Sequence, residues 1–114
     1  MRSAQGWSPS MSDHAPRELV VHDLRKGLGA TVKPSSRIVV KYTNYPYGEA
    51  PPSSQLARNG PDEVVLANEI EGWQRGLPGM RVGGRRELIV PTRLGDAPAT
   101  EVYIVDLLGV HPGS

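Results

Sequence analysis

The sequence predicts an α+β fold with about five strands and one short helix. Its best strand signal is the run from Arg37 to Tyr45, in which successive side chains alternate as on a half-buried strand. A second alternating run extends from Thr100 to Leu108. Between them, Ile70, Trp73 and Leu77 are spaced as neighbours on one face of a helix. Both signals in one small chain favour a sheet packed against a helix.

Length and composition limit the classes of function. A chain of 114 residues allows one domain with one modest core, and its net charge of +1 gives no general attraction to nucleic acid or membrane. The absence of cysteine excludes disulfide bonds and thiol catalysis. No stretch is apolar for long enough to span a bilayer, and none is typical of a signal peptide. We therefore expect a cytoplasmic protein that binds neither nucleic acid nor membrane.

The chain divides into a central domain and two tails. Residues 1–17 are polar and lack periodicity, so we expect a disordered N-terminal tail. Residues 18–110 hold all the strand and helix signals and form the predicted domain. Residues 111–114 are expected to be a short C-terminal tail.

Short apolar runs predict three further strands. They are Glu18–Leu24, Asp62–Ala67 and Arg85–Pro91, each with consecutive aliphatic residues. His22 is expected to be an exposed residue of the first strand, because adjacent Asp23 points to the opposite face.

The helix around Trp73 has a start signal and a stop signal. Asn68 is a candidate N-cap, and Glu71 three residues later completes the pattern of a capping box. Pro78-Gly79 ends the helix, because proline cannot continue the hydrogen-bond ladder and glycine accepts a left-handed exit. A single tryptophan in such a helix is more often core than site.

A dense motif surrounds this tryptophan. Between Glu69 and Pro91 the chain contains Ile70, Gly72-Trp73, Gly76-Leu77, Gly79-Met80, Val82-Gly83-Gly84, Arg86, Leu88 and Pro91 at fixed spacing. At this spacing the motif resembles the FKBP family, the macrolide-binding peptidyl-prolyl isomerases. Lys41–Asn44 and Val102–Val110 resemble two other strands of that family. The resemblance covers roughly residues 18–110.

The resemblance implies a fold, an activity and a site. The implied fold is FKBP-like: a twisted antiparallel sheet of about five strands that wraps the short helix, with an apolar pocket between them. The implied activity is peptidyl-prolyl cis-trans isomerisation of a proline-containing peptide or unfolded chain, without cofactor or metal. The implied catalytic residues are Tyr42, Ile70, Trp73 and Tyr103, and the implied substrate-binding residues are Val64, Val65, Leu94 and Val105.

Within that pocket, the resemblance gives each catalytic residue a separate role. Trp73 would be the floor, and Tyr42 and Tyr103 would be walls, with Tyr103 in place of a family phenylalanine. The backbone N–H of Ile70 would hold a carbonyl of the substrate.

The sequence departs from the family around this pocket. Pro51 and Pro52 stand where the family has a phenylalanine and an aspartate, and Asp62 stands where many relatives have another phenylalanine. After Pro91 the family's long loop with its tyrosine is missing, since Thr92–Ala99 leads almost directly to the last strand. These departures predict low activity and at most weak macrolide binding.

Two alternative functions remain open. The chain could be an FKBP-like module that binds a peptide or protein partner without useful catalysis. Its pocket could instead serve acid/base chemistry on a small molecule, with Asp62, Asp96 or Tyr103 as acid or base.

The histidines and arginines predict no further site. The three histidines are scattered, with no companion predicted for His111, which argues against a metal site. The arginines near the motif are interpreted as a solvated face, because acids balance them and no exposed aromatic residues are interleaved. They are Arg75, Arg81, Arg85, Arg86 and Arg93.

Overall fold

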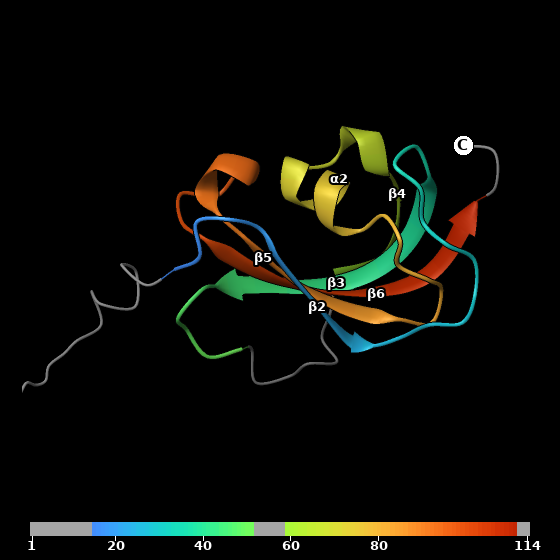
Figure 1. Ribbon diagram of the computed structural model, residues 1–114, viewed down its shortest axis with the longest axis horizontal. Coiled ribbons are helices and arrows are strands. Elements are labelled where there is room, and N and C mark those ends of the chain that lie inside the picture. Colours follow the sequence, from blue (N-terminus) through green and yellow to red (C-terminus); the bar gives the residue numbers. More distant parts are fainter. Residues whose placement is uncertain (1–14, 52–58, 112–114) are drawn as a thin grey trace, which may run out of the picture.

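A computed structural model of the protein describes residues 15–51 and 59–111. The five strands are β2 (Val20–Arg25), β3 (Arg37–Pro46), β4 (Asn59–Val65), β5 (Arg85–Val90) and β6 (Glu101–His111). They form one antiparallel sheet in the order β2-β5-β6-β3-β4 (Figure 1). One short helix, α2 (Glu71–Gly76), lies against one face of this sheet. The predicted α+β fold, with about five strands around one short helix, is confirmed.

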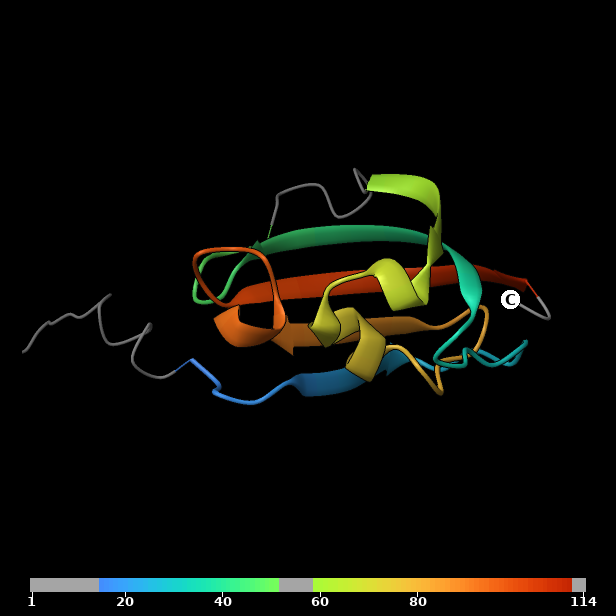
Figure 2. The ribbon, with the colours of Figure 1, turned by 90° about the horizontal axis from the view of Figure 1, so that it is seen from above.

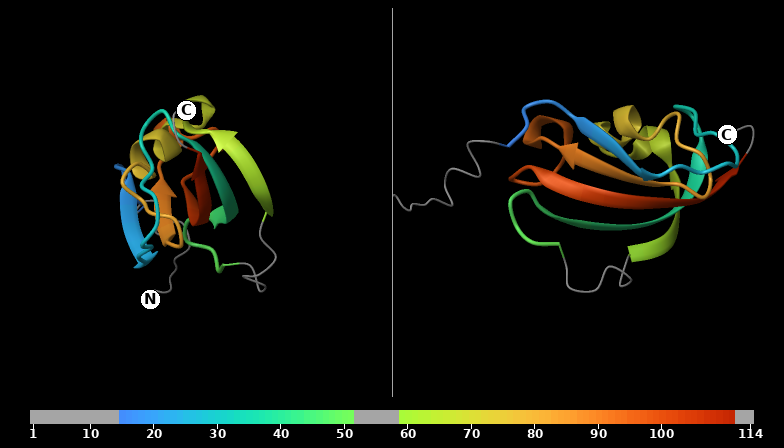
Figure 3. Two further views of the ribbon diagram at one scale, coloured as in Figure 1. Left: turned by 90° about the vertical axis from the view of Figure 1, so that its right-hand side faces the viewer. Right: turned by 60° about the horizontal axis from the view of Figure 1, so that its bottom comes forward.

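The sheet is open and curves around the helix (Figures 2 and 3). Its centre is the long pairing of β3 with β6, which runs from Arg37 opposite His111 to Pro46 opposite Glu101. β4 continues into a 3-10 helix, η1 (Leu66–Asn68), which leads to α2 on the concave side. Along the chain, a second 3-10 helix, η2 (Thr92–Leu94), follows β5 and precedes β6.

Two glycines allow α2 to approach β5 closely. A Cβ atom on Gly72 would lie 2.6 Å from Cγ1 of Val90, and one on Gly76 would lie 2.7 Å from Cδ2 of Leu88. Because no larger residue fits there, Gly72 and Gly76 of the motif fix the separation of helix and sheet. Between the two layers lies one core, made of Val32, Ile38, Val40, Leu66, Trp73, Leu77, Met80, Leu88, Val90, Leu94, Tyr103, Val105 and Leu107.

The start of α2 differs from the predicted capping box. Asn68 lies in η1, and the N-cap is Ile70, which makes no side-chain cap hydrogen bond. Leu66 is fully buried, and its N–H donates to the Ser36 carbonyl at 3.0 Å. Because Leu66 is held in this way, Asn68 belongs to the η1 turn, and the extended residues Glu69 and Ile70 lead from η1 to the helix. The prediction of Asn68 as N-cap was therefore wrong.

The strand boundaries also shift. β4 ends at Val65 where the prediction ran to Ala67, because Leu66 enters η1. β6 continues to His111 instead of ending at Leu108, because it pairs with β3 along its whole length. This extension brings Nε2 of His111 to 2.8 Å from a carboxylate oxygen of Glu63, so the expectation that His111 has no companion was wrong.

Two of the arginines are partly buried instead of lying on a solvated face. Arg86 donates from Nε to Asp23 at 2.7 Å and from Nη1 to the Gly76 carbonyl at 2.9 Å. It therefore ties the end of α2 to the edge strand β2. The hydrogen bond from Arg86 lowers the pKa of Asp23, with the charges of Arg86 and Lys26 adding to it, while burial opposes the shift.

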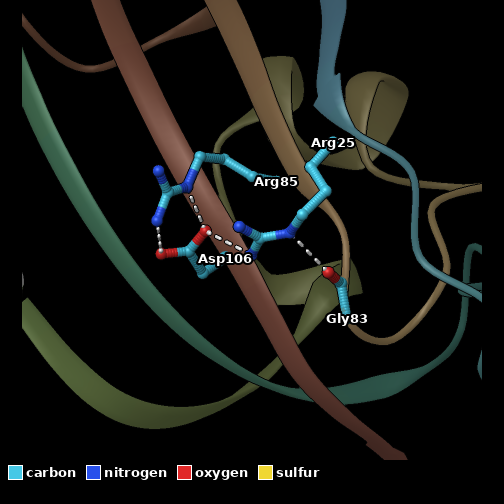
Figure 4. Close-up of polar contacts among 4 residues, drawn as sticks. All are labelled: Arg25, Gly83, Arg85 and Asp106. Carbon is cyan, nitrogen blue, oxygen red and sulfur yellow. Dashed lines mark hydrogen bonds and ion pairs between the residues drawn. The ribbon is translucent and has the colours of Figure 1, made fainter.

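A second ion pair lies on the sheet face opposite the helix (Figure 4). Arg85 donates to both oxygens of Asp106, at 2.7 and 3.3 Å, and Nη2 of Arg25 lies 3.8 Å from the same carboxylate. Nε of Arg25 donates to the Gly83 carbonyl at 3.0 Å. Since Arg25 ends β2, Arg85 begins β5 and Asp106 belongs to β6, this cluster joins three strands.

Removing the charge of Asp106 should destabilise the fold. We expect Asp106→Asn to lower the free energy of unfolding by about 1–3 kcal/mol, because two guanidinium groups lose their buried negative partner and one acceptor oxygen becomes an amide donor. The matched control is Glu71→Gln, which breaks an exposed i,i+4 pair with Arg75 and should cost about 0.5 kcal/mol or less. Urea denaturation measures both, and equal losses would contradict a structural role for the Asp106 cluster.

Candidate functional site

Three aromatic side chains from three different elements meet on the concave face. The Trp73 ring of α2 lies 5.1 Å from the Tyr42 ring of β3, and the two planes are at 89°. It lies 5.8 Å from the Tyr103 ring of β6, at 84°. The two tyrosine rings are 6.4 Å apart. The indole thus makes two edge-to-face contacts, the arrangement that aromatic pairs favour.

Strand register explains how the tyrosines come together. Tyr42 pairs with Val105 and Asn44 pairs with Tyr103, so the two tyrosines are diagonal neighbours on the same face of adjacent strands. Helix α2 places Trp73 over them. We call these three residues the aromatic cluster.

Polar donors of the cluster have no acceptor among the residues that the structure describes. Nε1 of Trp73 is sealed from solvent and has no hydrogen-bond partner. The hydroxyls of Tyr42 and Tyr103 make no hydrogen bond in residues 15–51 and 59–111, and neither does the backbone N–H of Ile70, the N-cap of α2. The two hydroxyls and the Ile70 N–H are free to donate to a ligand that carries acceptors, whereas the buried Nε1 of Trp73 is not accessible to one.

Burial and nearby acids keep the tyrosines protonated. Burial raises the pKa of Tyr103 to about 12, with Asp96 and Glu101 adding to the shift. Burial also raises the pKa of Tyr42, with further contributions from Asp62 and from Glu69. At neutral pH both phenols are therefore hydrogen-bond donors.

Glu69 lies next to the candidate site, and sequence reasoning did not single it out as a site residue. Burial raises the pKa of its carboxyl group, and the charges of Asp96 and Asp62 raise it further. The same three carboxylates act on Tyr42, so they surround the cluster with negative potential. The available signal was the position of Glu69, immediately before the donor Ile70.

The predicted substrate-binding residues fall into different places. Val64 is half-buried and packs against the core, whereas Val65 follows it on β4 and belongs to the opposite face. Leu94 and Val105 are buried and belong to the same core as Trp73 and Tyr103. Pro51 is exposed, and Pro52 lies outside the described residues, as do most of both predicted tails.

Within the described ranges, the structure offers no metal centre and no membrane span. No group of three or more His, Cys, Asp or Glu residues is arranged to hold a metal ion there. The same part of the chain has no helix of the length and hydropathy needed to cross a bilayer.

Comparison with known proteins identifies the family. The family model for the FKBP-type peptidyl-prolyl cis-trans isomerase matches residues 29–99, which include Tyr42, Ile70 and Trp73 of the site. The chain belongs to the FKBP family. Sequence relatives agree: a probable FK506-binding protein of Corynebacterium glutamicum is 36% identical over 105 residues, covering 82% of this chain and 88% of the relative. An FK506-binding protein of Neisseria meningitidis is 30% identical, covering 82% of this chain and 96% of the relative.

Solved structures share the FKBP fold. Escherichia coli FkpA superposes with a TM-score of 0.71 at 28% identity, over 84% of this chain and 49% of that one. A peptidyl-prolyl cis-trans isomerase of Pseudomonas syringae pv. tomato gives a TM-score of 0.68 at 21% identity, over 81% of this chain and 74% of that one. The FKBP motif read from the sequence thus coincides with the helix that carries Trp73.

Proposed function

We propose that this FKBP-family protein is a peptidyl-prolyl cis-trans isomerase of low activity, which acts on proline-containing peptides and unfolded chains without a cofactor. The observation that carries the proposal is the aromatic cluster of Tyr42, Trp73 and Tyr103 beside the unpaired N–H of Ile70. A proline ring packs well on aromatic faces, and the N–H can hold a carbonyl of the same segment.

The catalysis would come from the environment of the rotating bond. Rotation about a peptide bond meets a barrier of about 18–20 kcal/mol, because it breaks amide resonance. A twisted amide has lost the charge separation of the planar form, so a largely apolar site favours it over the ground state. The Ile70 N–H would fix the chain while the bond turns.

The short connection after β5 supports low activity. β5 ends at Val90 and β6 begins at Glu101, with only η2 and a few turn residues between them. A longer loop would exclude water from the site and grip the chain beyond the proline. Without one, a twisted amide gains less from desolvation. Unfolded chains, which supply their own apolar contacts, should therefore be better substrates than short peptides.

The proposal is tested by comparing two substrates. We expect slow but measurable acceleration on a tetrapeptide with one Xaa-Pro bond, and a larger effect on the proline-limited refolding of an unfolded protein. A wild-type protein that binds the tetrapeptide without accelerating its isomerisation would favour the binding module instead.

The activity should be independent of pH near neutrality. We expect no proton transfer in the rotation: burial raises the pKa of Tyr103 to about 12, and the Glu69 carboxyl, whose pKa burial also raises, neither gives nor takes a proton when an amide bond turns. The profile of kcat/KM should therefore be flat across that range. A bell-shaped profile would contradict the proposal and favour proton transfer by Asp62, Asp96 or Tyr103.

A further inference from the structure

The Tyr103 hydroxyl is a donor at the edge of the core, with carboxylates nearby that do not hydrogen-bond to it. Tyr103 is only 8% exposed, and its ring is held between Trp73 at 5.8 Å and Tyr42 at 6.4 Å. Its hydroxyl makes no hydrogen bond within the described ranges, yet it is not among the polar atoms sealed from solvent. The hydroxyl therefore keeps some contact with solvent, and among the described residues it has no partner, so water satisfies it there.

A ligand that displaces this water must supply an acceptor. An unsatisfied donor in a desolvated site costs more than its hydrogen bond would contribute. The hydroxyl stays protonated at neutral pH, so it donates and does not act as an anion. A prolyl peptide carries strong acceptors only in its backbone carbonyls, and the Ile70 N–H takes one of these under the proposed function.

We propose that the Tyr103 hydroxyl donates a hydrogen bond to a second backbone carbonyl of the bound prolyl peptide and so determines affinity for substrate. This inference rests on the proposed function and assigns a binding role to the hydroxyl itself, apart from the ring. The second carbonyl is not that of the rotating bond. A donor on that oxygen would stabilise the planar amide and oppose rotation, whereas a flanking carbonyl is the same acceptor in ground state and transition state.

The position of the hydrogen bond predicts its kinetic signature. An interaction that is equal in the ground state and the transition state contributes to binding and not to the chemical step. Removing the hydroxyl should therefore raise KM and the Kd of the peptide about threefold to tenfold, with the loss in kcat/KM coming from KM.

The test is Tyr103→Phe, which keeps the ring and removes one oxygen. The family carries phenylalanine at this position, so the variant should fold, and thermal unfolding checks this. The matched control is Tyr45→Phe, on the same strand as Tyr42. Tyr45 is half-buried and pairs with Val102 on the opposite face of the sheet. The Tyr45→Phe variant should therefore have the same KM as the wild type.

The readouts are KM and kcat on the tetrapeptide, and its Kd by calorimetry. A higher KM and Kd in Tyr103→Phe alone supports the inference. Equal values in the wild type and Tyr103→Phe, or a loss confined to kcat, overturns it while the proposed isomerase stands. If the wild type binds without catalysing, the proposed function fails and the Kd values still decide the inference. A wild type that does not bind the peptide overturns both.

Discussion

Replacing Trp73 with alanine is expected to lower the free energy of unfolding by about 3–5 kcal/mol. The side chain is 3% exposed and joins the helix to two strands through its contacts with Tyr42 and Tyr103. Its removal would leave a large cavity between helix and sheet. The two layers cannot close over this cavity, because the contacts of Gly72 and Gly76 with β5 fix their separation. Chemical denaturation of the wild type and the variant measures this difference.

The control for this loss is Leu108→Ala. Leu108 is also a large apolar residue of the sheet, but it is 47% exposed and lies outside the core. Its truncation should cost about 1 kcal/mol or less. An equal loss in the two variants, or an unchanged midpoint for Trp73→Ala, would show that Trp73 is not the centre of the core.

Macrolide affinity is expected to be weaker than in family members with a full pocket by about two to four orders of magnitude. The FKBP resemblance implies that Pro51 and Asp62 stand where such members have phenylalanines. Two lost aromatic contacts of about 1.5–3 kcal/mol each remove about 3–6 kcal/mol of binding free energy. Calorimetric titration with a macrolide measures the affinity, and nanomolar binding would contradict this expectation.

Restoring one aromatic wall should recover part of this affinity. Asp62 pairs with Val40, which is buried, and it lies on the same face of β4 as Val64. The phenylalanine ring of an Asp62→Phe variant would therefore point toward the cluster. We expect macrolide binding at least about tenfold tighter than in the wild type. Glu63→Phe is the matched control, because the next residue points to the opposite face and should leave the affinity unchanged.

The fold and the aromatic cluster could be predicted for different physical reasons. Regular alternation in β3 and β6 reports directly which side chains face the core, and the helical spacing of Ile70, Trp73 and Leu77 reports one buried face. The meeting of Tyr42 and Tyr103 with Trp73 depends on register between distant strands. No local pattern encodes that register, so the FKBP resemblance was needed to anticipate it.

The errors arose where tertiary contacts override local signals. Asn68 has the chemistry of an N-cap, but burial of Leu66 places it in a 3-10 turn before the helix begins. Arg86 resembles a surface charge, yet the sheet places it between Asp23 and the end of α2. The pKa of Glu69 is raised by burial and by the charges of Asp96 and Asp62, which come near it only in the folded chain.

If the aromatic cluster turns a prolyl peptide bond, the wild type and Trp73→Leu should differ in one isomerisation assay. Leucine keeps an apolar side chain in the core but removes the aromatic floor, and thermal unfolding confirms that the variant is folded at the assay temperature. We predict that the wild type accelerates the proline-limited refolding of an unfolded protein and that folded Trp73→Leu does not. Equal acceleration by both proteins, or none by the folded wild type on either the refolding chain or the tetrapeptide, would contradict the claim.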